Sequence, residues 1–103
     1  MHLDFFQLKN GLGEKMWKVC DPAGDYGQYS AGILPNLEAC YQRCKDGKLF
    51  DYEHGCKASY VSKGCSCTCY TKSDADGLCK TITQSKTKML YIIKKPGKLN
   101  SYQ

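Results

Sequence analysis

Residues 64–70, GCSCTCY, place Cys65, Cys67 and Cys69 at alternate positions. Alternate side chains lie on the same face of a β-strand, so a strand here presents three sulfurs to one layer. The chain of 103 residues contains eight cysteines in all, and the other five are Cys20, Cys40, Cys44, Cys56 and Cys79. Whether these sulfurs bind a metal, carry out redox chemistry or form disulfides decides what kind of protein this is.

The stretch that precedes these cysteines predicts one helix, over about residues 37–45. Asn36 is a suitable N-cap, and Gly47 provides a stop. Cys40 and Cys44 are four residues apart and therefore share a helix face. Along the helix axis these two cysteines are about 6 Å apart, which nearly matches the roughly 6.6 Å between alternate residues along a strand. Two disulfides can therefore lie side by side between the helix and the strand, reaching either residues 65 and 67 or residues 67 and 69.

Alternating patterns and turn signals predict an antiparallel sheet with strands at about residues 55–61, 65–71, 78–83 and 88–94. The first two strands would form one hairpin and the last two a second. Residues 1–35 show no clear periodicity, which predicts a loose N-terminal arm, and the tail after residue 96 should also be loose. The predicted fold class is α+β, a single small disulfide-rich domain spanning residues 1–103.

The composition favours disulfides over the other two uses of cysteine. Leu, Ile, Val and Phe together number 18, fewer than the roughly 20% of an ordinary globular chain. Each disulfide that closes a loop of about 15 residues adds roughly 3 kcal/mol of stability. Alternating strand cysteines suit zinc poorly, and the Cys-x-x-Cys motif of redox catalysts does not occur. We therefore predict no metal, no cofactor and secretion into an oxidising compartment.

Catalytic motifs are lacking in the sequence. The two histidines are His2 and His54, and none of the G-x-S-x-G, H-E-x-x-H or phosphate-loop motifs occurs. Asp51 and Glu53 alternate, which predicts a solvated strand edge. No run approaches the roughly 20 apolar residues of a membrane span. These observations predict a protein that is not an enzyme and has no transmembrane segment.

Charge divides the chain unevenly. Residues 1–76 hold nine basic and ten acidic side chains, whereas residues 77–103 hold six lysines and no acid. Lysine is a point charge, which fits an acidic protein surface, a glycosaminoglycan or an anionic lipid; nucleic acid is disfavoured because arginine is nearly absent. The alternative is that these lysines only solvate the final hairpin. The candidate binding residues here are Lys86, Lys88, Lys94 and Lys95.

Tyrosines provide a second candidate surface. Tyr26 and Tyr29 lie in a stretch rich in glycine, aspartate and serine, which predicts an adaptable loop. Tyrosine is favoured at binding surfaces because it offers amphipathic area at low entropic cost. The alternative is that most of the tyrosines replace aliphatic residues in the core.

The spacing C-x3-C on a helix and C-x-C on a strand, over about residues 36–70, resembles the cysteine-stabilised α/β motif of scorpion toxins and defensins. This resemblance implies that Cys56, which ends the family's Gly-x-Cys strand, bonds to Cys20. The preferred pairing is then Cys20–Cys56, Cys40–Cys65, Cys44–Cys67 and Cys69–Cys79. The chain departs from the motif in its third alternating cysteine and its long flanking segments. A weaker similarity is to cysteine-rich tick salivary proteins such as the chemokine-binding evasins.

Three hypotheses of function follow. The first is a secreted toxin-like or salivary effector that binds a host protein such as an ion channel, a protease or an immune mediator. The second is a defensin-like antimicrobial acting on anionic membranes, for which a net charge of +5 is dilute. The third is a secreted ligand read by a receptor.

Overall fold

A computed structural model describes residues 4–7, 9, 12, 17–54, 56, 64–75, 77–79 and 82–94. Within them lie one helix, α1 (Leu37–Cys44), and seven strands: β1 (Phe5–Gln7), β2 (Lys18–Cys20), β3 (Gln28–Leu34), β4 (Leu49–Glu53), β5 (Cys65–Tyr70), β6 (Ile82–Gln84) and β7 (Lys88–Ile93). The α+β class and the disulfide-rich character are as predicted. No helix in these ranges is long and apolar enough to cross a membrane.

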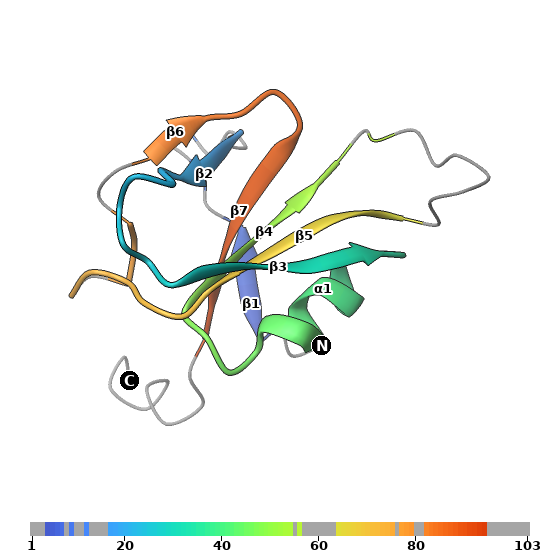
Figure 1. Cartoon of the computed structure of the whole chain (residues 1–103), viewed down its shortest axis with the longest axis horizontal. Helices are drawn as coiled ribbons and strands as arrows, with labels where there is room; N and C mark the ends of the chain where they lie inside the picture. The colour runs from blue at the N-terminus through green and yellow to red at the C-terminus, as the bar shows by residue number, and fades with distance from the viewer. Residues whose placement is uncertain are drawn as a thin grey trace.

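Five strands form an antiparallel sheet in the order β1-β7-β4-β5-β3, and β2 and β6 form a separate two-stranded sheet (Figure 1). The central strand β4 lies outside the four predicted strand ranges, although its sequence, LFDYE, is apolar and aromatic enough for a strand. It pairs with β5 in the register Tyr52↔Cys67. Of the strand expected at 55–61, only Cys56 lies within the described residues.

Helix α1 begins where its sequence predicts and ends at Cys44, one residue before the predicted end at about residue 45. The Asn36 side chain accepts a hydrogen bond from the Ala39 backbone N–H at 2.9 Å. Glu38 in the first turn and Arg43 in the last turn complement the helix dipole. These interactions stabilise a helix of eight residues, but a helix this short also needs packing from the rest of the fold.

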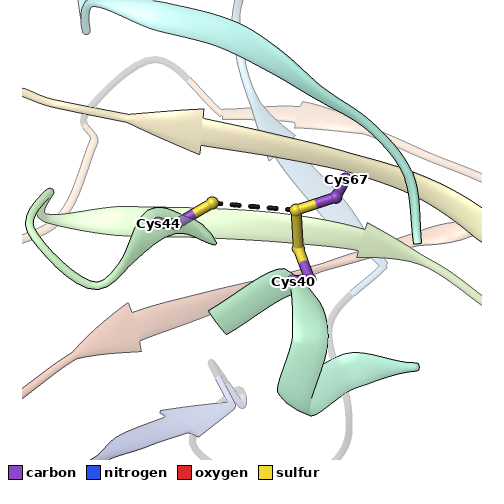
Figure 2. Close-up of side chains that lie close together, drawn as sticks. All are labelled: Cys40, Cys44 and Cys67. Atoms are coloured by element: carbon purple, nitrogen blue, oxygen red, sulfur yellow. Dashed lines mark hydrogen bonds between the residues drawn. A yellow bond between two sulfur atoms is a disulfide. The ribbon is translucent and has the colours of Figure 1, made fainter. Parts of the chain in front are cut away.

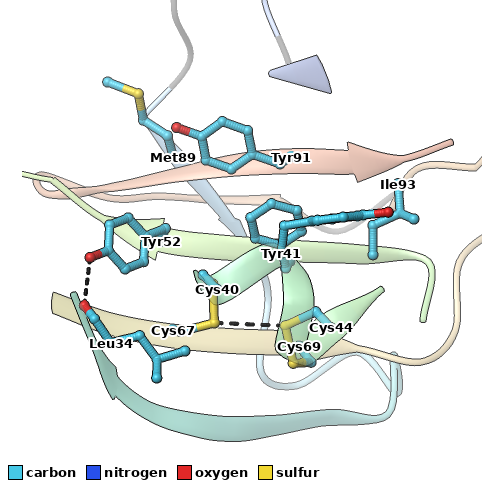
Figure 3. Packing of buried hydrophobic residues seen from close by; sticks show 11 residues of the cluster. Leu34, Cys40, Tyr41, Cys44, Tyr52, Cys67, Cys69, Met89, Tyr91 and Ile93 are labelled. Atoms are coloured by element: carbon cyan, nitrogen blue, oxygen red, sulfur yellow. Dashed lines mark hydrogen bonds between the residues drawn. A yellow bond between two sulfur atoms is a disulfide. The ribbon is translucent and has the colours of Figure 1, made fainter. Parts of the chain in front are cut away.

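The helix packs on one face of the five-stranded sheet, where the larger core cluster lies (Figure 3). Phe50 and Tyr91 stack there with ring centroids 5.0 Å apart, and the Tyr52 hydroxyl donates to the Leu34 carbonyl at 2.7 Å. Aromatic rings and cystines thus supply most of the volume that aliphatic side chains would fill in an ordinary core. This agrees with the expectation that tyrosines replace aliphatic residues.

A second, smaller cluster lies on the opposite face of the sheet, under the β2–β6 pair. Leu49, Tyr70 and Leu90 contribute from the five-stranded sheet, and the disulfide Cys20–Cys79 closes the cluster. The molecule therefore has three layers: the helix, the five-stranded sheet and the β2–β6 pair.

The expected second hairpin is wrong. Of the strand predicted at 78–83, the described residues Leu78 and Cys79 are not in a strand, whereas Ile82 and Thr83 belong to β6, which pairs with β2 rather than with β7. β7 lies between β1 and β4 instead. The loose N-terminal arm is also wrong for the described residues, because three strands lie before residue 35. Short strands of this kind are fixed by partners distant in sequence, which local patterns do not reveal.

The predicted disulfide pairing is wrong, although helix-to-strand bridging is confirmed. The bonds are Cys20–Cys79, Cys40–Cys67, Cys44–Cys69 and Cys56–Cys65. The two helix cysteines thus bond to residues 67 and 69, the second of the two pairs of strand positions that the spacing allowed. The reason is register: with Tyr52 opposite Cys67, the residues just after β4 lie near Cys65, so Cys56 takes that partner.

Candidate functional site

The sulfurs of Cys40, Cys44 and Cys67 all lie within 4.8 Å of one another (Figure 2). The Sγ atoms of Cys44 and Cys67, which belong to different disulfides, are 3.7 Å apart. A metal needs thiolate ligands, whereas each of these sulfurs is already bonded to another sulfur. With all three residues buried, the cluster is a covalent anchor for the helix.

The two predicted binding tyrosines have different environments. Tyr26 is buried in the smaller core cluster, and its hydroxyl donates to an Asp74 carboxylate oxygen at 3.3 Å. The expectation that Tyr26 is a surface residue is therefore wrong. Tyr29 lies on a strand rather than in a loop, and 49% of its surface is exposed.

The lysines do not form one patch. Lys86 lies exposed in the turn before β7, Lys88 is half-buried at the start of β7, and Lys94 follows its end. Six residues along a strand separate Lys88 from Lys94 by about 20 Å. The Lys94 ammonium lies 5.6 Å from the centroid of the Phe6 ring, a cation–π contact. Lys95 lies outside the described residues.

Strand β3 presents an apolar edge that sequence reasoning missed. Among the described residues it pairs with β5 alone, and none of its seven residues is charged. Tyr29 is 49% exposed and Ile33 is 53% exposed. A bulge between Ser30 and Gly32 shifts the register, so Tyr29 lies on the helix face and Ile33 on the opposite face. Gly32 has φ +90°, which suits glycine at such a bulge.

His54 lies among aromatic rings on the helix face of the sheet. Its Nε2 is 2.6 Å from the Tyr91 hydroxyl, and its ring meets Tyr52 and Trp17 edge-on. Burial raises the pKa of Tyr91 to about 12, so the phenol stays protonated at neutral pH. We interpret this contact as part of the packing.

Asp51 lies at the centre of the sheet face opposite the helix and is only 1% exposed. The prediction of a solvated edge is therefore wrong. The Tyr70 hydroxyl donates a short hydrogen bond to Oδ2, and Oδ1 has no hydrogen-bond partner. Burial raises the pKa of Asp51 to about 6. The Tyr70 hydroxyl, the positive charge of Lys88 and the Thr68 hydroxyl act in the opposite direction and lower this pKa in part. The sequence signal that could have indicated this burial is an acidic residue flanked by two large aromatic residues, as in LFDY.

Asp51 lines an open pocket of about 290 Å³ between the five-stranded sheet and the β2–β6 pair. Thr68 and Tyr70 lie beside it on β5, and Val19 and Gln84 face it from the two-stranded sheet. Their convergence requires strands from the whole length of the chain. The pocket therefore exists only in the folded molecule.

No family model, curated protein or solved structure matches the chain. Function must therefore be inferred from the molecule's own surfaces.

Proposed function

We propose that the chain is a secreted, non-enzymatic effector, of a toxin-like or salivary kind, that binds a partner protein through the edge strand β3. The observation that carries the proposal is an uncharged edge strand with two large exposed apolar side chains, Tyr29 and Ile33. Monomeric proteins usually protect an edge strand with lysine, proline or a covering loop. An edge left apolar suits an extended segment of a partner, which adds to the sheet as a further strand.

The disulfides support this proposal in two ways. Four bonds are typical of small domains that act in an oxidising compartment. Two of them join α1 to β5, the strand with which β3 pairs. Strand β3 is therefore held in place before a partner binds. Preorganisation lowers the entropic cost of binding. The excess of lysine favours a partner whose surface is acidic.

Binding by β3 predicts a specific effect of charge on that strand. Ile33→Lys should lower the affinity for the partner at least about tenfold, because a lysine at the edge opposes strand addition. Thr83→Lys is the matched control, since Thr83 is an exposed strand residue on the separate β2–β6 pair. The measurement is biolayer interferometry of both variants and the wild type on the partner recovered by affinity capture from extracellular fluid.

Three results would count against the proposal. Equal affinity of the Ile33→Lys and Thr83→Lys variants would remove β3 from the interface. Salt-sensitive leakage of anionic liposomes in the absence of any protein partner would favour the antimicrobial hypothesis. A wild-type dimer in sedimentation velocity that Ile33→Lys dissociates would show that β3 pairs with a second copy instead.

A further inference from the structure

The disulfide Cys56–Cys65 differs from the other three in its exposure to solvent. The other six cysteines are each between 0% and 1% exposed, whereas Cys56 and Cys65 are both half-buried. A thiolate opens a disulfide by direct attack on one of its sulfur atoms, so the rate depends on access to the bond. A reductant can therefore reach Cys56–Cys65 in the folded molecule, whereas it reaches the other three bonds only after the fold opens around them.

The same bond also constrains the chain least. Cys56 and Cys65 are 9 residues apart in the sequence, whereas the separations across the other bonds are 25, 27 and 59 residues. In the loop-entropy account, the stability that a disulfide adds grows with the length of the loop that it closes. Opening Cys56–Cys65 removes the smallest of the four contributions and leaves both bonds between α1 and β5 in place, together with Cys20–Cys79. The fold should therefore persist after this one bond opens.

Cys65 lies where strand β5 pairs with the end of the edge strand β3. Leu34 is the residue opposite Cys65, and it directly follows the exposed Ile33. The backbone is in close contact there, since a Cβ on Gly64 would lie 2.0 Å from the Leu34 carbonyl oxygen. The bond from Cys56 fixes the first residue of β5 at this contact. Opening the bond thus removes a covalent restraint from one end of the pairing between β5 and β3.

We propose that Cys56–Cys65 is a site of thiol–disulfide exchange, opened by a dithiol while the other three bonds stay intact, and that its opening loosens the Leu34 end of β3. Exposed disulfides are the ones that exchange most readily in other proteins. An effect of this reduction on partner binding would rest on the function proposed above for β3, whereas the exchange itself does not.

The exchange proceeds in two steps. One thiolate of the dithiol attacks a sulfur of the Cys56–Cys65 bond, which forms a mixed disulfide and releases the other cysteine as a thiolate. The second thiolate of the dithiol then attacks the dithiol's own sulfur in the mixed disulfide, which closes the reductant's disulfide and releases the second cysteine. Two electrons pass from the dithiol to the cysteines, and the two protons of the dithiol end on the two cysteine sulfurs.

The first test is stepwise reduction of the native protein at pH 7.5 with dithiothreitol as the dithiol. Samples are quenched in acid, free thiols are blocked with N-ethylmaleimide, and the labelled cysteines are mapped by mass spectrometry. Cys56 and Cys65 should be labelled at least about tenfold faster than the other six, and a species with three disulfides should accumulate. Earlier or equal labelling of another pair, or loss of all four bonds in a single step, would overturn the exchange site.

The second test replaces Cys56 and Cys65 together with serine, which imitates the opened bond without a reductant. Amide hydrogen exchange across residues 33–34 and 65–66 should become at least about threefold faster, because the covalent restraint at that end is gone. Residues 28–30, at the other end of β3, are the internal control and should exchange as in the wild type.

Each other outcome of the second test contradicts a part of the proposal. Unchanged exchange at both ends of β3, or equal acceleration at both ends, would refute a loosening of the Leu34 end. A double variant that fails to fold would refute the claim that the other three bonds suffice. Neither test uses a protein partner, so failure here is separate from failure of the binding proposed for β3.

Discussion

Replacing Asp51 with asparagine should stabilise the protein at neutral pH and leave its stability nearly unchanged in acid. Burial raises the pKa of Asp51 from its ordinary 3.8 to about 6 in the folded state. Because the folded protein holds this proton more tightly than the unfolded chain, the carboxyl favours folding most below pH 3.8. That contribution is lost as the pH rises to about 6 and beyond.

The size of this stability change follows from the difference between the two pKa values of Asp51. Between 3.8 and about 6, each pH unit is worth 1.36 kcal/mol, so charging Asp51 costs about 3 kcal/mol of unfolding free energy. The side chain is almost wholly buried, so solvent screening does not reduce this value much. Asparagine has nearly the same shape and carries no charge, and it therefore escapes this cost.

The assay is urea unfolding of the wild type and of Asp51→Asn, with disulfides intact, from about pH 3 to pH 7.5. The difference in unfolding free energy should be near zero at the acid end and should rise by about 3 kcal/mol in favour of the variant. Subtracting the two curves cancels the other titrating groups.

A direct measurement complements the stability curves. The ¹³C resonance of the Asp51 carboxyl should titrate with a midpoint near 6. Tyr70→Phe removes a hydrogen bond that lowers this pKa, so the midpoint should move higher in that variant. A midpoint near 4 in the wild type, or a stability difference that stays flat across the pH range, would refute the reasoning.

Three further predictions concern stability. Replacing Cys44 and Cys69 together with alanine should lower the unfolding free energy by about 3.5 kcal/mol, because the lost bond closes a loop of 25 residues; denaturant unfolding measures this, and a loss under 1 kcal/mol would contradict it. Asn36→Ala should cost about 1 kcal/mol through the lost N-cap, with reduced amide-exchange protection at Ala39, whereas unchanged protection would show that the cap is dispensable. Gly27→Ala should lower the melting temperature, because a Cβ there would lie 1.9 Å from Thr71 Oγ1 at φ +62°, and an unchanged melting temperature would show that Thr71 rotates away without cost.

Local sequence was a reliable guide where a single short segment contains the whole cause. The cap at Asn36, the four-residue spacing of Cys40 and Cys44 and the alternation around Cys67 each act within a few residues. They predicted helix α1, strand β5 and the pair of bridges between them. The paucity of aliphatic residues likewise predicted that disulfides and aromatic rings would hold the core.

The sites depended on information that no single segment contains. Whether Asp51 is solvated or buried is decided by the β2–β6 pair, whose strands are more than 60 residues apart in the chain. Whether Tyr29 and Ile33 are exposed depends on β3 being the last strand of the sheet.

By itself, the sequence determined the chemistry of this protein: a disulfide-rich α+β domain with one capped helix tied to an alternating strand. Only the tertiary structure decided which cysteines pair, which strand lies at the edge and which carboxyl group is buried. The physical reason is that helix capping and side-chain alternation are set by neighbouring residues. Strand order and burial are instead set by the packing of the whole chain, in which every strand competes for partners at once.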